Sequence, residues 1–292
     1  MSKNIKIQTQ EQINAFFKNT VQYWRDIYDK EDAQPLMYIH RQDTTVQWIE
    51  ELTPDSAFRV LDIGCGAGML SIELARRGLQ VEGIDPVPEM IDLARRTSEE
   101  KGVAKQPSFS VGNIYAIDAP DASYDVVVAL GVFVYLDRPK DALREMRRVT
   151  KPGGYIIFST ENQYALMGWL DPLRNPLLRA CWVPILTALR KRGITIRNPW
   201  PDKMASKGTP WLEMQPGDPH LTDRLIAFSG LRKCKGITMS FYPIMFMGHP
   251  LLPKSLGIWL GECLDRMSRQ KIPLIRSLGE IYLVMAKKEV VD

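Results

Sequence analysis

Three glycines and two acidic residues in the first half of the chain have the types and spacing of a ligand-binding loop. Gly64, Gly66 and Gly68 follow a short apolar run, and glycine lets a ligand come close to the backbone because no Cβ intervenes. Asp62 precedes the loop, and Asp85 ends a second apolar run 21 positions after Gly64. A carboxylate at that position can accept both hydrogen bonds of a ribose diol. These residues predict a nucleoside site, with a plain tight turn as the alternative interpretation.

The glycine spacing and the first acid separate two classes of nucleoside ligand. In the dinucleotide pattern the third glycine comes five residues after the first, whereas Gly68 comes four residues after Gly64. The carboxylate of Asp62 would repel a pyrophosphate and attract an ammonium group, although Asp62 could also merely cap the loop. S-adenosylmethionine carries an adenosine, an ammonium and a sulfonium, and it has no phosphate. The pattern favours such a ligand over a nicotinamide dinucleotide.

The loop stands in a chain of alternating strands and helices. Short apolar runs predict five strands, at residues 58–63, 79–84, 108–111, 124–130 and 155–159. Apolar residues at helical spacing predict three helices between them, at residues 68–77, 86–101 and 138–149. Alternation of this kind predicts an α/β fold with a Rossmann-like, doubly wound and mostly parallel sheet that helices cover on both faces.

The rest of the chain is expected to complete one domain around this core. Residues 1–50 predict an N-terminal helical lid, residues 51–160 the cofactor-binding core, and residues 161–292 the rest of the sheet with insertions on the substrate side. The last part also predicts one helix and two strands, at residues 221–229, 235–242 and 280–287. The insertions are too apolar for linkers. They should pack over the carboxyl edge of the sheet, where ligands bind in open α/β folds.

Residues 58–160 resemble a class I S-adenosylmethionine-dependent methyltransferase. Five segments are similar to motifs of that family and occur in its order: VLDIGCGAG, VEGIDPVPEMIDLAR, FSVGNIYAI, YDVVVALGVFVYL and VTKPGGYIIFST. Within that family, the segments most resemble the small-molecule methylases of quinone and natural-product pathways. The resemblance implies S-adenosyl-L-methionine as the cofactor and methyl transfer to a lipophilic or aromatic small molecule, at oxygen. Transfer to nitrogen or carbon, or a binding module without turnover, are the alternatives.

The resemblance also implies cofactor contacts along the core. They are Asp62, Gly64, Cys65 and Gly66 around the methionine part, Asp85 at the ribose, Pro86, Met90, Asn113 and Ile114 at the adenine, and Leu130 near the methionine chain. The family often has aspartate where this chain has Asn113, whose amide oxygen can still accept from the adenine amino group. Met90 could equally be a core residue, and Cys65 is expected to fill space rather than act as a nucleophile. Arg41 is a candidate partner for the cofactor carboxylate, with an ordinary surface arginine as the alternative.

The acceptor side offers few candidates for a general base. If a hydroxyl is methylated, a base that removes its proton assists the reaction, and histidine is a common choice. The chain has three histidines, His40, His220 and His249. We expect His220, which lies next to the helix predicted at residues 221–229, to be the catalytic base. A surface or helix-capping histidine is the alternative, and His40 is the second candidate.

Two apolar segments are candidates for the wall of an acceptor site. Residues 172–192 combine Trp, Leu and Ile with a basic end, which suits an interfacial helix or a lipophilic pocket wall, although prolines disfavour both. The other segment has aromatic side chains spaced for one helical face, which indicates either core packing or a lid over the acceptor. Its members are Phe16, Phe17, Tyr23, Trp24 and Tyr28.

Composition and charge narrow the partners. A net charge of +4 is too small to indicate nucleic-acid binding. Residues 161–292 carry 19 Lys and Arg against 11 Asp and Glu, which suits an anionic substrate, a peripheral membrane contact or simply a solvated surface. Four cysteines without a CxxC pair predict neither a metal site nor a disulfide framework. With no signal peptide or membrane span expected, we predict a soluble cytoplasmic protein whose partner is a small-molecule acceptor.

Overall fold

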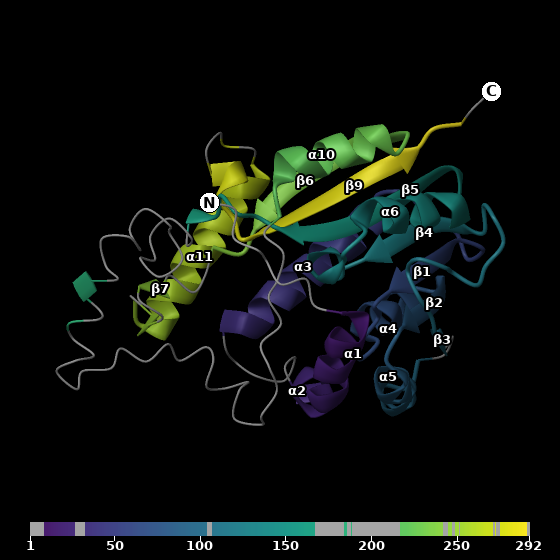
Figure 1. The fold of residues 1–292 in the computed structure, drawn as a ribbon, viewed down its shortest axis with the longest axis horizontal. Helices are drawn as coiled ribbons and strands as arrows, with labels where there is room; N and C mark the ends of the chain where they lie inside the picture. Colours follow the sequence, from purple (N-terminus) through teal and green to yellow (C-terminus); the bar gives the residue numbers. More distant parts are fainter. Residues whose placement is uncertain are drawn as a thin grey trace.

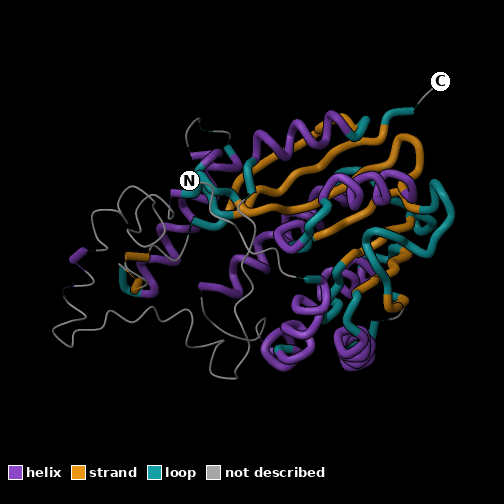
Figure 2. Tube along the Cα trace, viewed as in Figure 1, coloured by secondary structure: helices purple, strands orange, loops and turns teal. Residues whose placement is uncertain are grey.

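The computed structural model describes most of the chain, and Figure 1 shows its elements. The described residues are 9–26, 33–103, 107–166, 184–185, 188, 217–241, 245–246, 249–250, 252–270, 272 and 275–290. They contain a seven-stranded sheet with the order β3-β2-β1-β4-β5-β9-β6. Helices lie on both faces of this sheet (Figure 2). The predicted Rossmann-like, mostly parallel α/β fold is confirmed.

Five strands of the sheet run parallel and two pairings at one end are antiparallel. The parallel strands are β1 (Arg59–Ile63), β2 (Gln80–Asp85), β3 (Ser108–Val111), β4 (Tyr124–Ala129) and β5 (Thr150–Glu161). Strand β9 (Ile281–Lys288) is antiparallel to both of its neighbours, β5 and β6 (Leu231–Met239). Strands β5 and β6 begin earlier than the sequence predicts. In each, pairing continues past a register shift, with Thr150 opposite Tyr124 and Leu231 opposite Lys288.

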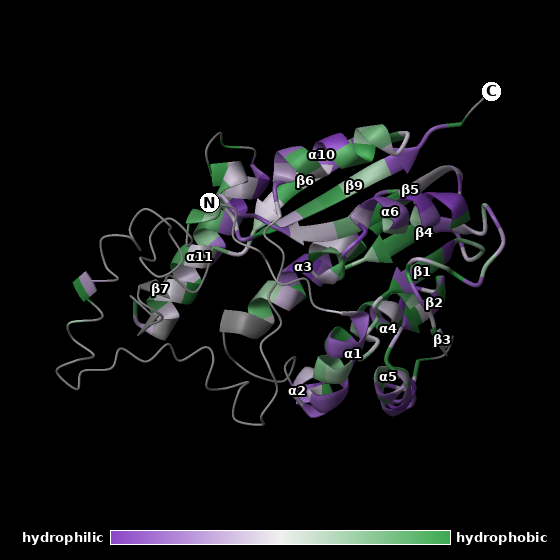
Figure 3. Ribbon diagram, viewed as in Figure 1, coloured by the Kyte–Doolittle hydropathy of each residue, from purple (hydrophilic) through white to green (hydrophobic). Residues whose placement is uncertain are grey.

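Two apolar layers hold the helices against the sheet. Ile49, Ile72 and Ile91 are buried in the first layer, and Leu143 and Ile226 are buried in the second. The helices of the first layer are α3 (Ala33–Glu50), α4 (Met69–Arg76) and α5 (Pro88–Glu100), and those of the second are α6 (Pro139–Val149) and α10 (Pro219–Phe228). Strand β4 is buried along nearly its whole length between the layers, as expected for a strand covered on both faces. Figure 3 colours this strand as hydrophobic.

Two more helices precede α3 and pack against α5. Helix α1 (Gln10–Asn19) begins with a capping box, in which the Gln12 N–H donates to the Thr9 hydroxyl and the Thr9 N–H donates to the Gln12 side chain. Phe17 on α1 and Trp24 on α2 (Val21–Asp26) pack against a cluster that contains Met90. The N-terminal region is therefore helical, as predicted. Its action as a lid stays a prediction, and Tyr28 lies outside the described residues.

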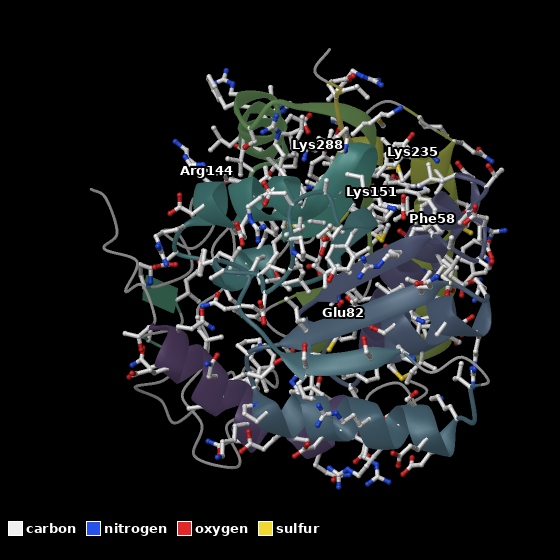
Figure 4. All side chains as sticks on the ribbon, turned by 90° about the vertical axis from the view of Figure 1, so that its right-hand side faces the viewer. Phe58, Glu82, Arg144, Lys151, Lys235 and Lys288 are labelled. Carbon is white, nitrogen blue, oxygen red and sulfur yellow. The ribbon has the colours of Figure 1, made fainter. Side chains whose placement is uncertain are left out.

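Charged side chains form an ion pair and hydrogen bonds at the amino edge of the sheet. The ammonium of Lys151 lies 2.8 Å from a carboxylate oxygen of Asp125. The ammonium of Lys288 donates to the carbonyl oxygens of Arg147 and Thr150. Figure 4 looks at the molecule from this side, with Lys151 and Lys288 labelled. The opposite, carboxyl edge is the one that receives the glycine loop.

The remaining described elements lie toward the carboxyl edge or within the predicted insertions. They are η2 (Phe133–Tyr135), β7 (Met245–Phe246), β8 (His249–Pro250), α11 (Lys254–Arg269) and η3 (Ile275–Ser277). Helix α11 contacts β6 and η3. The segment 172–192 lies almost wholly outside the described residues, and so does the His249 side chain. In the described part of the chain, no helix combines the length and hydropathy needed to cross a bilayer.

Candidate functional site

The glycine loop joins β1 to α4 and faces a space that protein atoms leave open. The backbone of Gly64 and Gly66 is left-handed, with φ of 68° and 53°, a conformation that side-chain-bearing residues rarely adopt. A Cβ on Gly64 would lie 2.5 Å from the Val132 side chain, so this glycine is required by packing. A Cβ on Gly66 would meet no atom within 4 Å. Gly66 therefore marks where a ligand can approach the loop.

These two glycines should respond differently to alanine. We expect Gly64→Ala to lower the free energy of unfolding by about 2 kcal/mol or more, because it adds a clash to the backbone strain. Gly66→Ala should cost only about 1 kcal/mol of strain, but its methyl group would enter the ligand space. Urea unfolding and calorimetric titration of the cofactor would measure both effects. Gly66→Ala with unchanged cofactor affinity would contradict this assignment.

Asp62 lies beneath the loop as a buried carboxylate. The residue is 3% exposed, and the hydroxyl of Ser71 on α4 donates to its Oδ2 at 2.7 Å. Burial raises the pKa of Asp62 to about 7, and the charge of Asp85 adds to the rise. The Ser71 hydrogen bond and the positive charge of Arg41 act in the opposite direction. The positive charge of a cationic ligand beside this carboxylate would favour its ionised form and so offset the effect of burial.

Asp85 ends β2 and ties the loop to the next helix. Its Oδ2 accepts from the Gly66 N–H at 3.1 Å, and its Oδ1 accepts from the Val87 N–H at 2.9 Å. Burial raises the pKa of Asp85 to about 6, against the lowering effect of these two hydrogen bonds. Burial also raises the pKa of the Cys65 thiol, so it stays protonated and uncharged, as a space-filling residue would. Each Asp85 oxygen has a second lone pair with which it can accept from a ligand hydroxyl.

Arg41 reaches the same edge from α3. Its guanidinium donates to the Ser159 hydroxyl at the end of β5, at 3.5 Å, and lies over the Tyr38 ring at 5.4 Å from the ring centre. A Cβ on Gly131, two residues after β4, would lie 2.9 Å from an Arg41 nitrogen. The Nε atom of Arg41 is buried and has no hydrogen-bond partner in the described structure. An arginine packed in this way is poised to receive an anionic group of a ligand.

An aromatic wall adjoins Arg41. The Phe17 ring meets the Tyr135 ring edge-on with 5.4 Å between centres, and the Trp24 ring meets Tyr38 at 5.5 Å. Burial raises the pKa of Tyr135 to about 12, and the nearby charge of Glu161 adds to the rise. Phe17 and Trp24 belong to the aromatic set that the sequence singled out, but they lie on two helices, α1 and α2, rather than on one helical face, whereas Tyr38 lies on α3 and Tyr135 on η2. Phe17, Trp24 and Tyr135 pack against small buried clusters, which agrees with the core-packing alternative.

Of the residues expected at the adenine, two are buried and two are exposed. Met90 is 2% exposed and packs with Trp24, which is the core alternative that the sequence left open. Ile114 is buried in the layer under α6, whereas Pro86 is exposed at the end of β2. Asn113 is exposed, and its Oδ1 accepts from the Tyr115 N–H at 2.9 Å. The remaining predicted contact, Leu130, follows β4 and packs against the first apolar layer.

The two described histidine side chains have different surroundings. His220 is exposed in the first turn of α10, where the Asp218 carboxylate caps the helix by accepting from the His220 backbone N–H at 2.8 Å. Its ring centre lies 6.4 Å from that of Tyr164. His40, beside Arg41 on α3, has its Nδ1 atom 3.4 Å from the Asp265 carboxylate on α11. The assignment of His220 as the base stays a prediction.

Sequence reasoning missed several polar residues of this edge. Ser71 and Ser159 hold Asp62 and Arg41, and Asp265 holds His40, yet none of the three has a neighbour in sequence that would signal its role. Each acts on a partner from another element of the fold. In the described ranges, no group of three or more His, Cys, Asp or Glu could hold a metal ion.

Comparison with known families identifies the core. The family described as "Methyltransferase domain" matches residues 61–158, from the second half of β1 to the middle of β5. Residues 61–158 are therefore similar to a methyltransferase domain. The resemblance inferred from the sequence motifs is thereby confirmed. The match includes Asp62, the glycine loop and Asp85, and it excludes Arg41 and Asp265.

The curated relatives align with this chain over only part of their own length. Ubiquinone biosynthesis O-methyltransferase from Paracidovorax citrulli (strain AAC00-1) is 30% identical over 151 residues, which are 52% of this chain and 62% of that protein. The protein of the same name from Aeromonas salmonicida (strain A449) is 39% identical over 105 residues, 36% of this chain and 44% of its own. The chain thus spans about half the length of these relatives.

Solved structures share the fold over nearly the whole length of this chain. Magnesium protoporphyrin IX methyltransferase from Synechocystis PCC 6803, determined with bound SAH, has a TM-score of 0.62 and 17% identity, covering 96% of this chain and all of its own. The [4+2]-cyclase SpnF has a TM-score of 0.61 and 14% identity, covering 97% of each chain. At such identities the likeness shows the fold alone.

Proposed function

We propose that this protein transfers a methyl group from S-adenosyl-L-methionine to a hydroxyl oxygen of a lipophilic or aromatic small molecule. The observation that carries the proposal is the open space at Gly66, whose N–H donates to the buried Asp85 carboxylate. A second buried carboxylate, Asp62, precedes the same loop, and the incompletely paired Arg41 lies at the ends of the neighbouring strands β4 and β5. Asp62 and Asp85 suit the cationic amino acid part and the ribose, respectively. Arg41 suits the carboxylate of the same ligand. The family match over residues 61–158 supports this fit.

The reaction asks the protein chiefly to bind and orient. The cofactor supplies a methyl group that its sulfonium has already activated. Asp62, Asp85 and Arg41 fix the nucleoside and amino acid ends, so the acceptor oxygen has only to approach in line at about 3 Å. The wall formed by Phe17, Trp24 and Tyr135 excludes water and offers ring faces to an aromatic acceptor.

The acceptor class and the surroundings of the enzyme belong to the same proposal. Relatives named ubiquinone biosynthesis O-methyltransferase support a quinone-like acceptor and transfer to oxygen. We propose a small-molecule partner rather than a nucleic acid, a cytoplasmic location, and a peripheral membrane contact through the basic C-terminal half for uptake of a lipophilic acceptor. Pull-down on vesicles with anionic lipid tests the membrane contact.

A binding module without turnover is the second candidate. A [4+2]-cyclase shares the fold, so the fold by itself does not identify methyl transfer. Calorimetric titration with S-adenosylmethionine and, separately, with NADH tests the cofactor. Absence of binding at millimolar S-adenosylmethionine would overturn the proposal. Transfer of a tritiated methyl group to pools of phenols and reduced quinones then separates an enzyme from a binding module.

Asp85 provides a single-residue test of the nucleoside position. We expect Asp85→Ala to weaken cofactor binding by about tenfold or more, because hydrogen bonds to a charged group contribute about 1.5–3 kcal/mol. Asp92→Ala on α5, whose side chain is 67% exposed, is the control and should bind as the wild type does. Calorimetry measures both affinities, and circular dichroism checks the fold. Equal affinities for Asp85→Ala and wild type would place the nucleoside elsewhere.

A further inference from the structure

A histidine–carboxylate pair lies at the carboxyl edge outside the cofactor contacts. His40 Nδ1 is 3.4 Å from Asp265 Oδ2, and the two residues are 225 positions apart in sequence. The Asp265 side chain is 3% exposed, and that of His40 is 20% exposed. A buried carboxylate that accepts Nδ1–H fixes the ring and leaves Nε2 as the basic nitrogen. The separation is long for a hydrogen bond, and such contacts commonly shorten when substrate binds.

Asp265 is also held by a residue with an unusual backbone conformation, Ser240. Oδ1 of Asp265 accepts from the Ser240 N–H at 2.8 Å, just beyond the end of β6. Ser240 has φ of 69°, in the left-handed region that serine rarely adopts. Its hydroxyl is buried and has no hydrogen-bond partner in the described structure. Strain of this kind persists where surrounding contacts enforce it, and it clusters at functional sites.

The pair lies on the same sheet edge as the proposed cofactor site, two strands beyond β5. Arg41, the next residue after His40, lies against Gly131 and Ser159 at the ends of β4 and β5. Asp265 and Ser240 lie at the end of β6, which follows β9 and β5 along the same edge. Helix α3 therefore presents Arg41 toward the cofactor and His40 toward the neighbouring part of the edge.

We propose that His40 is the general base for the acceptor hydroxyl and that Asp265 is its positioning residue. The proposal rests on the proposed function. The acceptor oxygen forms its bond to the methyl carbon as the carbon–sulfur bond breaks, and the hydroxyl proton passes to Nε2 of His40. Asp265 stabilises the resulting imidazolium, which then releases its proton to water. The products are the methyl ether, the neutral thioether of the cofactor and one proton.

One variant separates this role from a structural link between α3 and α11. In His40→Asn the amide nitrogen falls near the position of Nδ1 and can still donate to Asp265, but it cannot accept a proton. Asp265→Asn keeps an oxygen for the Ser240 N–H and removes the charge. Asp43→Asn is the matched control for Asp265→Asn, because it makes the same chemical change at an exposed position of α3, the helix that carries His40. Thermal unfolding checks that all variants fold.

The test uses 4-nitrophenol, whose phenolate absorbs visible light, with protein loaded with S-adenosylhomocysteine. At a pH where the free probe is mostly neutral, we expect the wild type and Asp43→Asn to show the phenolate band of the bound probe. His40→Asn should lower the bound phenolate at least about tenfold, and Asp265→Asn severalfold. Equilibrium dialysis measures bound probe, so loss of the band is not confused with loss of binding.

The outcomes are decisive for His40. A wild-type complex without phenolate overturns the proposal, and so does a band that survives in His40→Asn. Loss of the band in His220→Gln, with His40→Asn unchanged, overturns it and supports the base expected from the sequence. Calorimetry with S-adenosylmethionine on the same wild-type sample keeps the two hypotheses apart. If the wild type does not bind S-adenosylmethionine, the proposed function is contradicted. If it binds the cofactor but shows no bound phenolate, only the role of His40 is contradicted.

Discussion

Cofactor affinity should rise by about 20-fold or more between pH 5.5 and pH 7.5. In the ligand-free protein the pKa of Asp62 is raised to about 7 and that of Asp85 to about 6, so both are largely protonated at pH 5.5. A cationic ligand needs the ionised forms and must displace these protons, which costs about tenfold in affinity per pH unit below each pKa. Calorimetric titration of S-adenosylmethionine at several pH values measures the slope.

Asp62→Asn should flatten this dependence to about fourfold, the part that Asp85 contributes. The same variant should stabilise the ligand-free protein near pH 8. The pKa of Asp62 is higher in the folded than in the unfolded protein, so the folded protein binds more protons between these two values. The free energy of unfolding of the wild type therefore falls as pH rises from about 4 to about 7. Thermal unfolding of both proteins across this range tests the sign. A wild-type affinity that does not change with pH would mean that neither carboxylate contacts the cofactor.

Arg41→Met should weaken S-adenosylmethionine binding by about 10-fold to 100-fold. A charge-assisted contact to a carboxylate contributes about 1.5–3 kcal/mol, and methionine keeps most of the packing against Tyr38 without the charge. Methylthioadenosine, which lacks the amino acid part, should bind both proteins equally. The comparison of the two ligands isolates the carboxylate contact from any change in the fold.

Arg144→Met on α6 is the matched control for this substitution. Its side chain is 81% exposed and points outward at the periphery in Figure 4. We expect its affinity for both ligands to equal that of the wild type. If Arg41→Met weakened methylthioadenosine as much as S-adenosylmethionine, the arginine would act on the fold of the site rather than on the carboxylate.

The glycine loop and its acids were predictable because they are local in sequence. Asp62, Gly64 and Gly66 lie within a single strand-to-helix turn, and Asp85 ends the next strand. Parallel strands bring their carboxyl ends to one edge, so the order of the elements suffices to place all four residues together. The helices and strands of residues 58–160 follow from the same apolar periodicity. Their bounds differ from the prediction mainly where pairing continues past a register shift, as at Thr150.

Met90 and Asn113 illustrate where motif position is insufficient. Met90 stands in a motif segment, but it packs against Trp24 of an N-terminal helix whose placement no local pattern determines. Asn113 uses its amide oxygen to accept from the Tyr115 N–H, and this turn contact depends on the backbone conformation beyond β3. In both cases the surroundings come from how elements pack, which sequence periodicity does not specify.

By itself the sequence determined the alternation of strands and helices and the loop at the end of β1, and it predicted a nucleoside ligand, because each depends on residues a few positions apart. Tertiary structure decided which distant side chains share the edge. It brings Arg41 from α3 to the ends of β4 and β5, and it pairs His40 with Asp265 across 225 positions. Such contacts depend on the docking of α3 and α11 against the sheet. Docking is set by the summed burial of apolar surface, and that burial leaves no mark on the spacing of the polar residues it brings together.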